Sequence, residues 1–245
     1  MSTIMSRIPL LTAFGASNGI ICPLFAMITC LPRPERPASS PCNRIFILWT
    51  CSAPSQTWRT FLNNHVRDLV SIDFFTVPTA RLRVLFVFII LSHQRRRVIH
   101  FNVTEHPTSA WTAQQIIEAF PEDQAPRYLI RDRDGIYGEY FQHRVQGMGI
   151  REVRTAPRSP WQNPFVERLI GSLRRDCLNH VIVMNERHLR RILKSYFRYY
   201  HDSRTHLSLD KDPPESRPIQ HMELGPIISI PQVGGLHHRY ERRAA

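Results

Sequence analysis

The chain has 245 residues, of which 42% are hydrophobic, which suits a globular core of one large domain or two small ones and argues against a disordered chain. Lys and Arg number 32 against 20 Asp and Glu, giving a formal net charge of +12. Only Lys194 and Lys211 are lysines, so the positive charge is almost entirely guanidinium, which favours a polyanionic partner such as nucleic acid.

The segment 1–56 differs from the rest of the chain. Residues 8–32 carry no charge, but prolines and glycines interrupt this run, so we expect no membrane span. Residues 32–41 are proline-rich, which is typical of a linker. Four of the five cysteines lie in this segment without the close spacing of zinc ligands, which predicts free thiols in a reducing, cytoplasmic compartment. We therefore predict a disordered or irregular N-terminal segment.

An acid stands out in the apolar segment that follows a short helix predicted over 58–65. Ile72 alternates with Asp73, so a strand here would point Asp73 away from the face that carries Ile72. A carboxylate in an apolar strand is costly unless it is paired or bound to metal. The spacing alone leaves two interpretations open, an ion pair with an arginine such as Arg81 or Arg83, and a metal ligand.

Strands and helices are predicted in alternation through the middle of the chain. The apolar run 82–92 and the alternating run 97–104 predict a hairpin inside a well-covered sheet. Apolar residues at helical spacing between two prolines predict a helix over 108–120. Farther along, the pattern predicts a short helix over 140–148 and an edge strand over 150–155. Periodicity therefore indicates an α/β protein.

Two more acids follow the β-prone triplet 128–130. Asp132 and Asp134 lie where a buried strand meets solvent, and a strand end is a rigid place for a ligand. Because residues two apart on a strand share a face, both acids remain candidates on spacing alone.

A further acid is predicted on a helix. Pro164 suits the first turn of that helix, and Glu167 lies beside its buried stripe, with Arg174 and Arg175 on the polar side. The stripe is formed by apolar residues at spacings of three and four, namely Val166, Leu169, Ile170, Leu173 and Cys177. Folding can therefore bring one helix-borne acid to the strand-end acids.

The last predicted helix spans 187–200. Its apolar stripe is accompanied by a charged flank that includes Arg191 and Lys194, which we expect to contact phosphate. The segment 218–245 is predicted to be a basic, mobile C-terminal tail.

Four segments together resemble a known family. They are 70–77 (VSIDFFTV), 132–137 (DRDGIY), 155–168 (TAPRSPWQNPFVER) and 199–206 (YYHDSRTH). In this order they resemble insertion-sequence transposases and integrases with a retroviral-type catalytic core, and the resemblance covers about 57–217. It implies a ribonuclease-H-like α/β fold with a mixed five-stranded sheet flanked by helices.

The resemblance also implies a chemistry. Asp73, Asp132 and Glu167 match the family's three catalytic carboxylates, so Asp73 is expected to bridge two Mg²⁺ or Mn²⁺ ions, with Asp132 on one and Glu167 on the other. The five-residue offset to Tyr137 favours Asp132 over Asp134, which we expect to be a turn acid. Two such ions activate the attacking oxygen and stabilise the departing one. The implied activity is cleavage of DNA at element ends and transfer of the strand to target DNA.

Contacts with DNA are implied for several other residues. Asn163 and Arg174 resemble family positions near the site, and Arg168 and Arg175 are expected to contact phosphate. Transposases of this type act as multimers, so the resemblance implies a homo-oligomer on DNA. It also implies a place at the nucleoid and no membrane partner.

The segment before residue 57 contains nothing that resembles the helix-turn-helix region found ahead of the core in family members. We therefore interpret the chain as a truncated or frame-shifted element. Two alternatives to an active transposase core remain, a catalytically inert DNA-binding remnant of a mobile element and a ribonuclease H.

Overall fold

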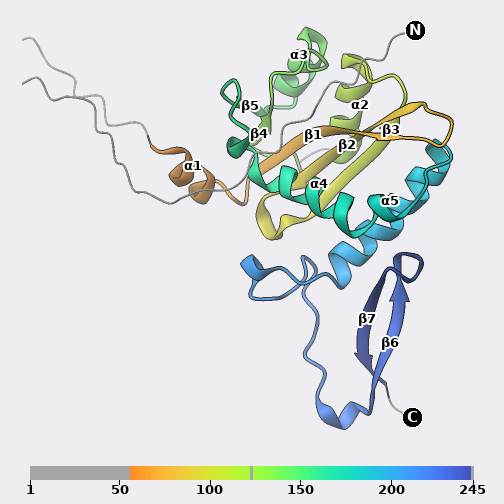
Figure 1. Cartoon of the computed structure of the whole chain (residues 1–245). Helices are drawn as coiled ribbons and strands as arrows, with labels where there is room; N and C mark the ends of the chain where they lie inside the picture. Colours follow the sequence, from red (N-terminus) through yellow and green to blue (C-terminus); the bar gives the residue numbers. More distant parts are fainter. Residues whose placement is uncertain (1–55, 122–123, 244–245) are drawn as a thin grey trace, which may run out of the picture. The chain divides into compact units, whose positions relative to one another are not determined.

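Figure 1 shows the computed structural model of the protein, which describes residues 56–121 and 124–243. The α-helices are α1 (Trp58–Asn64), α2 (Ser109–Ala119), α3 (Glu139–Gly147), α4 (Pro164–Asp176) and α5 (Glu186–Asp202). The strands are β1 (Leu69–Pro78), β2 (Val84–Ser92), β3 (Val98–Thr104), β4 (Tyr128–Arg131), β5 (Arg151–Arg154), β6 (Ile227–Gln232) and β7 (His237–Arg242). Short 3-10 helices are η1 (Gln94–Arg96), η2 (Pro160–Gln162), η3 (Leu178–His180), η4 (Leu207–Leu209), η5 (Met222–Leu224) and η6 (Val233–Gly235).

The predicted mixed sheet of five strands is confirmed, in the order β3-β2-β1-β4-β5. β1, β2 and β3 are antiparallel neighbours, whereas β4 pairs parallel to β1 and β5 pairs parallel to β4. Strands β1 to β3 precede α2, after which strands and helices alternate, which is the order expected of the ribonuclease-H-like fold. The apolar β2 lies inside the sheet and β5 lies at its edge, as their sequences predicted.

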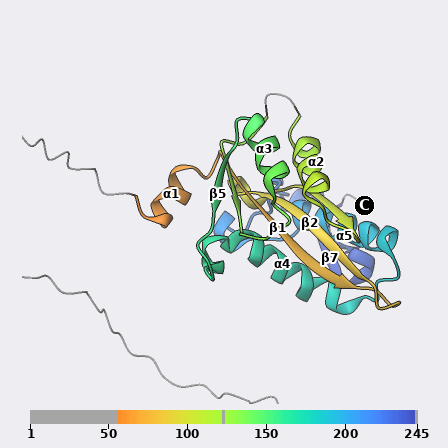
Figure 2. The same cartoon turned by 90° about the horizontal axis from the view of Figure 1, so that it is seen from above.

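Helices cover both faces of the sheet. α4 and α5 pack on one face through a core that includes Val87, Leu173 and Tyr196, and α2 and α3 pack on the other through one that includes Ile72 and Phe141. Figure 2 shows the sheet lying between the α2–α3 pair and α4. Because side chains alternate along β1, the residues that alternate with Ile72 face α4 and α5.

The C-terminal segment differs from the prediction of a mobile tail, because β6 and β7 form an antiparallel hairpin. Gly234 and Gly235 adopt positive φ angles of 67° and 93° in the turn, a conformation that glycine adopts without a steric penalty. The His237 ring stacks on Tyr199 of α5 with ring centroids 4.4 Å apart, and its Nε2 donates to the Asp176 carbonyl at 2.7 Å. The sequence prediction weighed the glycines and the basic composition but missed the strands on either side.

Predictions for the N-terminal segment and for the four cysteines in it concern residues outside the described ranges. Of the helices that the structure describes, none combines the length and the apolar character required to cross a bilayer. The fifth cysteine, Cys177, is buried in the core beneath α4, which agrees with its place in the predicted apolar stripe.

Candidate metal-binding and catalytic site

Asp73 lies in the middle of β1, on the face that turns toward α4. Ser71 and Phe75, its neighbours two positions away on that face, are buried, and Asp73 itself is half-buried. Arg83 forms its ion pair with Glu105 instead, and no ion pair among the described residues involves Asp73. Its Oδ1 accepts a hydrogen bond from the Phe74 backbone N–H at 2.8 Å.

The parallel pairing of β1 with β4 brings Asp132 level with Asp73. Ser71 pairs with Ile130, so two more positions along both strands place Asp132, just past the end of β4, beside Asp73. Asp132 Oδ1 accepts from the backbone N–H of Asp134 at 3.1 Å, and Asp134 Oδ1 accepts from that of Ile136 at 3.0 Å. Both acids therefore stabilise the tight turn that leaves β4.

Glu167 occupies the first turn of α4 and is exposed. Asn163 precedes the helix as its N-cap residue, and its Nδ2 donates to the Ile72 carbonyl of β1 at 3.3 Å. This contact fixes the start of α4 against the strand that carries Asp73. The helix begins here because Pro164 fits the first helical position, where no backbone N–H donor is needed.

All four acids line one pocket of about 370 Å³, which we call the carboxylate pocket: Asp73, Asp132, Asp134 and Glu167. Asn163, Arg133 and the segment 155–159 complete its wall. Arg133 is fixed to the opposite segment of this wall, because its Nε donates to the Thr155 carbonyl at 2.9 Å. Residues that are widely separated in the chain are thus brought together at the carboxyl end of β4 and the start of α4.

The carboxylate pocket concentrates negative charge. Burial raises the pKa of Asp73 to about 7, and repulsion from the carboxylates of Asp132, Glu167 and Asp134 adds to the rise, in that order of size. Partial desolvation also raises the pKa of Glu167. The buried Tyr137 phenol has its pKa raised, chiefly by burial and then by Asp73. Acids that gather without a paired cation are a signature of a functional site.

The donor set fits a hard divalent cation. Carboxylate oxygens from three chain segments are the ligands that Mg²⁺ and Mn²⁺ prefer. The Asn163 Oδ1 atom is buried and receives no hydrogen bond from any described residue. Within the described ranges, however, no three Asp, Glu, His or Cys side chains stand close enough to enclose an ion as they are placed here. A metal would therefore draw the acids inward.

The other residues predicted to contact DNA lie in three different places. Arg174 packs over the Phe75 ring, 5.5 Å from its centroid, and donates to the Thr76 carbonyl at 3.2 Å, so it ties α4 to β1. Arg168 and Arg175 are exposed and line a different pocket beside α4. Arg191 and Lys194 are exposed on α5 and line neither of these pockets.

Sequence reasoning missed a buried arginine directly behind the acids. Arg131 is 2% exposed, and its Nε donates to Glu152 Oε2 of β5 at 2.5 Å, while its guanidinium packs against the Tyr137 ring. The alternation of side chains along β4 could have indicated that Arg131 is buried, because Arg131 shares a face of the strand with the buried Leu129. This arginine supports the end of β4 that presents Asp132.

A second missed contact supports β1. Ser71 Oγ and His93 Nε2 are 2.5 Å apart in the core, and the His93 ring packs edge-on against Phe165 at 4.7 Å. Burial and the nearby charge of Arg96 lower the pKa of His93 to about 3, so its ring is neutral. No local pattern predicts this pairing, because Ser71 lies in β1 and His93 follows the end of β2, 22 positions later.

One family model matches part of this chain. Residues 148–214 match the family model of the integrase core domain. The matched segment includes Asn163 and Glu167, and the resemblance to integrase-type catalytic cores is confirmed for that segment.

Similar proteins come from mobile elements and retroviruses. An uncharacterized 39.2 kDa protein of insertion element IS476 from Xanthomonas euvesicatoria is 24% identical over 187 residues, covering 74% of this chain and 49% of that protein. The chain thus spans about half the length of the curated relative it matches. A chain of the simian T-cell lymphotropic virus intasome is similar with a TM-score of 0.49 and 14% identity, over 71% of this chain and 66% of its own. The catalytic domain of the Mos1 mariner transposase has a TM-score of 0.49 and 14% identity, over 58% and 77%.

Proposed function

We propose that this chain, which matches the integrase core domain over residues 148–214, is the catalytic core of a transposase that cuts and joins DNA strands with divalent metal ions. The observation that carries the proposal is the carboxylate pocket. It gathers Asp73 from β1, Asp132 from the end of β4 and Glu167 from α4, although folding such like charges together is unfavourable without a cation.

Asp73, Asp132 and Glu167 would hold the metal, with Asp73 between the other two. When bound, a pair of Mg²⁺ or Mn²⁺ ions activates the attacking oxygen of water or of a 3′-hydroxyl and stabilises the departing oxygen. The protein's own part is to position these carboxylates. Asn163 does so by fixing the start of α4 to β1, and Asp132 does so through the turn that leaves β4. No nucleophile from the protein is required, because the attacking oxygen belongs to water or to a 3′-hydroxyl.

The substrate class follows from charge. A net charge of +12 favours a polyanion, and phosphodiester chemistry at hard cations uses a nucleic acid as that polyanion. Arg133 and Arg158 line the carboxylate pocket and would contact phosphates of a strand bound there. We infer DNA as the substrate from the family resemblance, and we infer action as a homo-oligomer on DNA in the same way.

A plasmid-nicking assay tests the proposal. Purified protein is incubated with supercoiled DNA in Mg²⁺, in Mn²⁺ or in EDTA, and we expect nicking only with a divalent ion. Asp73→Asn should remove that nicking because the carboxylate shared by both ions is lost. Asp68→Asn, an exposed acid just ahead of β1, is the matched control and should keep it. Metal-dependent nicking by Asp73→Asn would show that the assigned site is wrong.

A second candidate function is that of an inert DNA-binding remnant. It is favoured by the absence, within the described residues, of an acid cluster tight enough to enclose an ion. The same purified protein separates the two functions. Binding to DNA that strengthens as salt falls, without nicking under either metal, would favour the remnant.

A further inference from the structure

A second pocket lies beside α4, and its charge is opposite to that of the carboxylate pocket. We call it the arginine pocket; its volume is about 530 Å³ and its basic lining residues are Arg96, Arg168, Arg175, Arg204 and His206. None of the described residues that line it is acidic. Arg96 belongs to η1, Arg168 and Arg175 to α4, and Arg204 follows α5. Three separate segments of the chain therefore deliver four guanidinium groups to one concavity.

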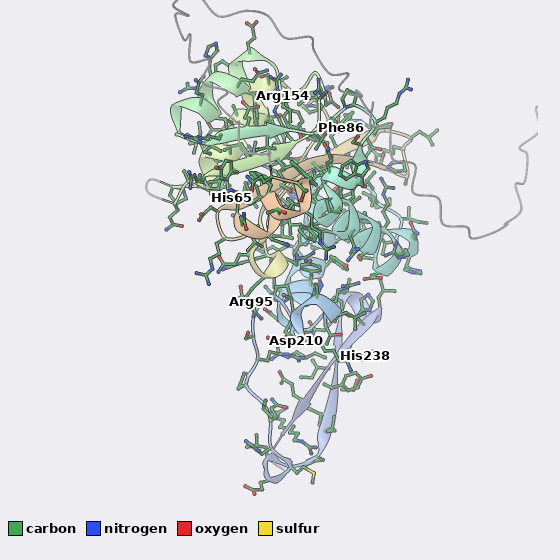
Figure 3. All side chains as sticks on the ribbon, turned by 90° about the vertical axis from the view of Figure 1, so that its left-hand side faces the viewer. His65, Phe86, Arg95, Arg154, Asp210 and His238 are labelled. Carbon is green, nitrogen blue, oxygen red and sulfur yellow. The ribbon has the colours of Figure 1, made fainter. Side chains whose placement is uncertain are left out.

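Arg96 is fixed in place rather than loosely exposed. Its guanidinium carbon lies 3.4 Å from the centroid of the Phe165 ring, a close cation–π contact. Its carbonyl accepts a hydrogen bond from the Tyr200 hydroxyl at 3.2 Å, and no described residue accepts a hydrogen bond from its guanidinium. The neighbouring Arg95, labelled in Figure 3, pairs with Asp212 at 2.8 Å and ties η1 to the segment after α5. The donors of Arg96 are thus held rigidly and remain available.

Other polar atoms in the arginine pocket also lack partners. His206 Nε2 is buried and forms no hydrogen bond with a described residue. Thr205 and Ser208 also line this pocket. Arg204 differs from the other arginines, because its Nε donates to Asp176 Oδ2 at 3.0 Å. Among the described residues, Asp176 is the only acid that forms an ion pair with any of the four arginines.

Crowding of like charge adds a driving force for anion binding. The pKa of Arg96 is lowered by burial and by the nearby Arg168. The pKa of His206 falls to about 4 through burial and through repulsion from Arg204 and Arg96. A bound anion removes this repulsion and accepts hydrogen bonds from the free donors.

We propose that the arginine pocket binds backbone phosphates of a DNA strand that continues into the carboxylate pocket. Glu167 and Arg168 are consecutive in α4 and therefore point about 100° apart, one into each pocket. The guanidinium groups come from three segments and line a pocket of about 530 Å³, an arrangement suited to several phosphates rather than to one. The inference rests on the proposed function only for the identity of the polymer.

Salt-dependent DNA binding tests the proposal. Affinity for a fluorescein-labelled duplex of arbitrary sequence is measured by anisotropy from about 50 to 200 mM NaCl, where each phosphate contact contributes about 0.9 to the slope of log affinity against log salt. Arg96→Gln should reduce the slope by about one unit. Arg81→Gln removes the same charge from an exposed loop and should leave the slope unchanged. Arg96 decides the test. If DNA bound only to exposed surface charge, the half-buried Arg96 would contribute less to the salt slope than the exposed arginines.

A second variant guards against misfolding of Arg96→Gln, which is checked by circular dichroism. Arg168→Gln/Arg175→Gln changes two exposed side chains and should reduce the slope by about two units. Its matched control is Arg59→Gln/Arg81→Gln. The proposal is wrong if Arg96→Gln folds and keeps the slope of the wild-type protein. If Arg96→Gln does not fold, the proposal is wrong when the double variant in α4 keeps that slope.

A third arm distinguishes a nucleic-acid backbone from a free anion. Inorganic phosphate and NaCl are compared at equal ionic strength in thermal unfolding and in competition with the duplex. Phosphate that raises the Tm while Arg96→Gln leaves the DNA slope unchanged would identify a small-anion site only and overturn the assignment to DNA. The nicking assay is scored separately. If Arg96→Gln reduces the salt slope but the wild-type protein does not nick DNA, the arginine pocket is supported and only the proposed function is contradicted.

Discussion

The carboxylate pocket and the arginine pocket both border α4, yet they accumulate opposite charge. The first holds the half-buried Asp73 among other acids without an ion-pair partner, and the pKa of Asp73 rises to about 7. The second keeps Arg168 and Arg175 exposed and neutralises Arg204 in part with Asp176. Repulsion between like charges is therefore strongest where a charged group is removed from solvent. The carboxylate pocket should therefore respond more strongly to loss of charge and to counterions.

The largest effect should come from Asp73→Asn in metal-free protein. The pKa of Asp73 is raised from 3.8 to about 7 in the folded protein, so the unfolded chain loses this proton at a lower pH than the folded chain does. The free energy of unfolding therefore falls as pH rises from about 4 to about 7, and it stays constant above that range. One pKa unit corresponds to about 1.4 kcal/mol, so the variant should gain roughly 2–4 kcal/mol at pH 8 and little near pH 4. Urea denaturation at both pH values measures this.

Asp68→Asn, whose side chain is exposed, is the control for that measurement and should show no such pH-dependent gain. An Asp73→Asn gain of equal size at both pH values would mean that the repulsion described for the carboxylate pocket is absent.

The next effect concerns the neutralised part of the arginine pocket. Asp176 Oδ2 accepts from Arg204 Nε and, at 3.2 Å, from the buried Tyr196 hydroxyl. Asp176→Ala leaves both donors without a partner, and because the pair is partly exposed we expect a loss of about 2 kcal/mol. Asp176→Asn keeps an acceptor oxygen and should lose less. Equal stability of the Ala and Asn variants in urea denaturation would contradict this interpretation.

Divalent ions should sharpen the contrast between the two pockets. Mg²⁺ at ten times its dissociation constant stabilises a folded protein with one binding site by about 1.4 kcal/mol. We expect such a gain for the wild-type protein and none for Asp73→Asn, measured as a shift in Tm against NaCl of the same ionic strength. An identical shift in both proteins would place the ion elsewhere.

The smallest effect separates Asp132 from Asp134. Asp132 contributes more than Asp134 to raising the pKa of Asp73, as its position level with Asp73 requires. Asp132→Asn should therefore lower the pKa of Asp73 more than Asp134→Asn does, with stability gains at pH 8 below about 1.4 kcal/mol. Titration of Asp73 by NMR measures both shifts. A larger shift with Asp134→Asn would reverse our choice of the second ligand.

Local patterns predicted the elements well and their contacts poorly. The helices and strands from Trp58 to Tyr200 form where apolar periodicity placed them, because burial of an apolar face decides their type. The hairpin of β6 and β7 was missed, since both strands are short and at most half buried, and β7 carries the charged residues Arg239, Glu241 and Arg242. The ion pair of Arg131 with Glu152 was missed because the two residues lie on neighbouring strands.

The alternation of strands and helices, the excess of positive charge and the acids at Asp73, Asp132 and Glu167 can be read from the amino-acid sequence. Which charges become neighbours depends on how the strands and helices pack. The parallel pairing of β1 with β4 sets Asp73 beside Asp132, and the packing of α4 against η1 sets Arg168 near Arg96. This is because periodicity indicates which face of an element is buried, whereas electrostatic repulsion depends on distances between elements that no local pattern contains.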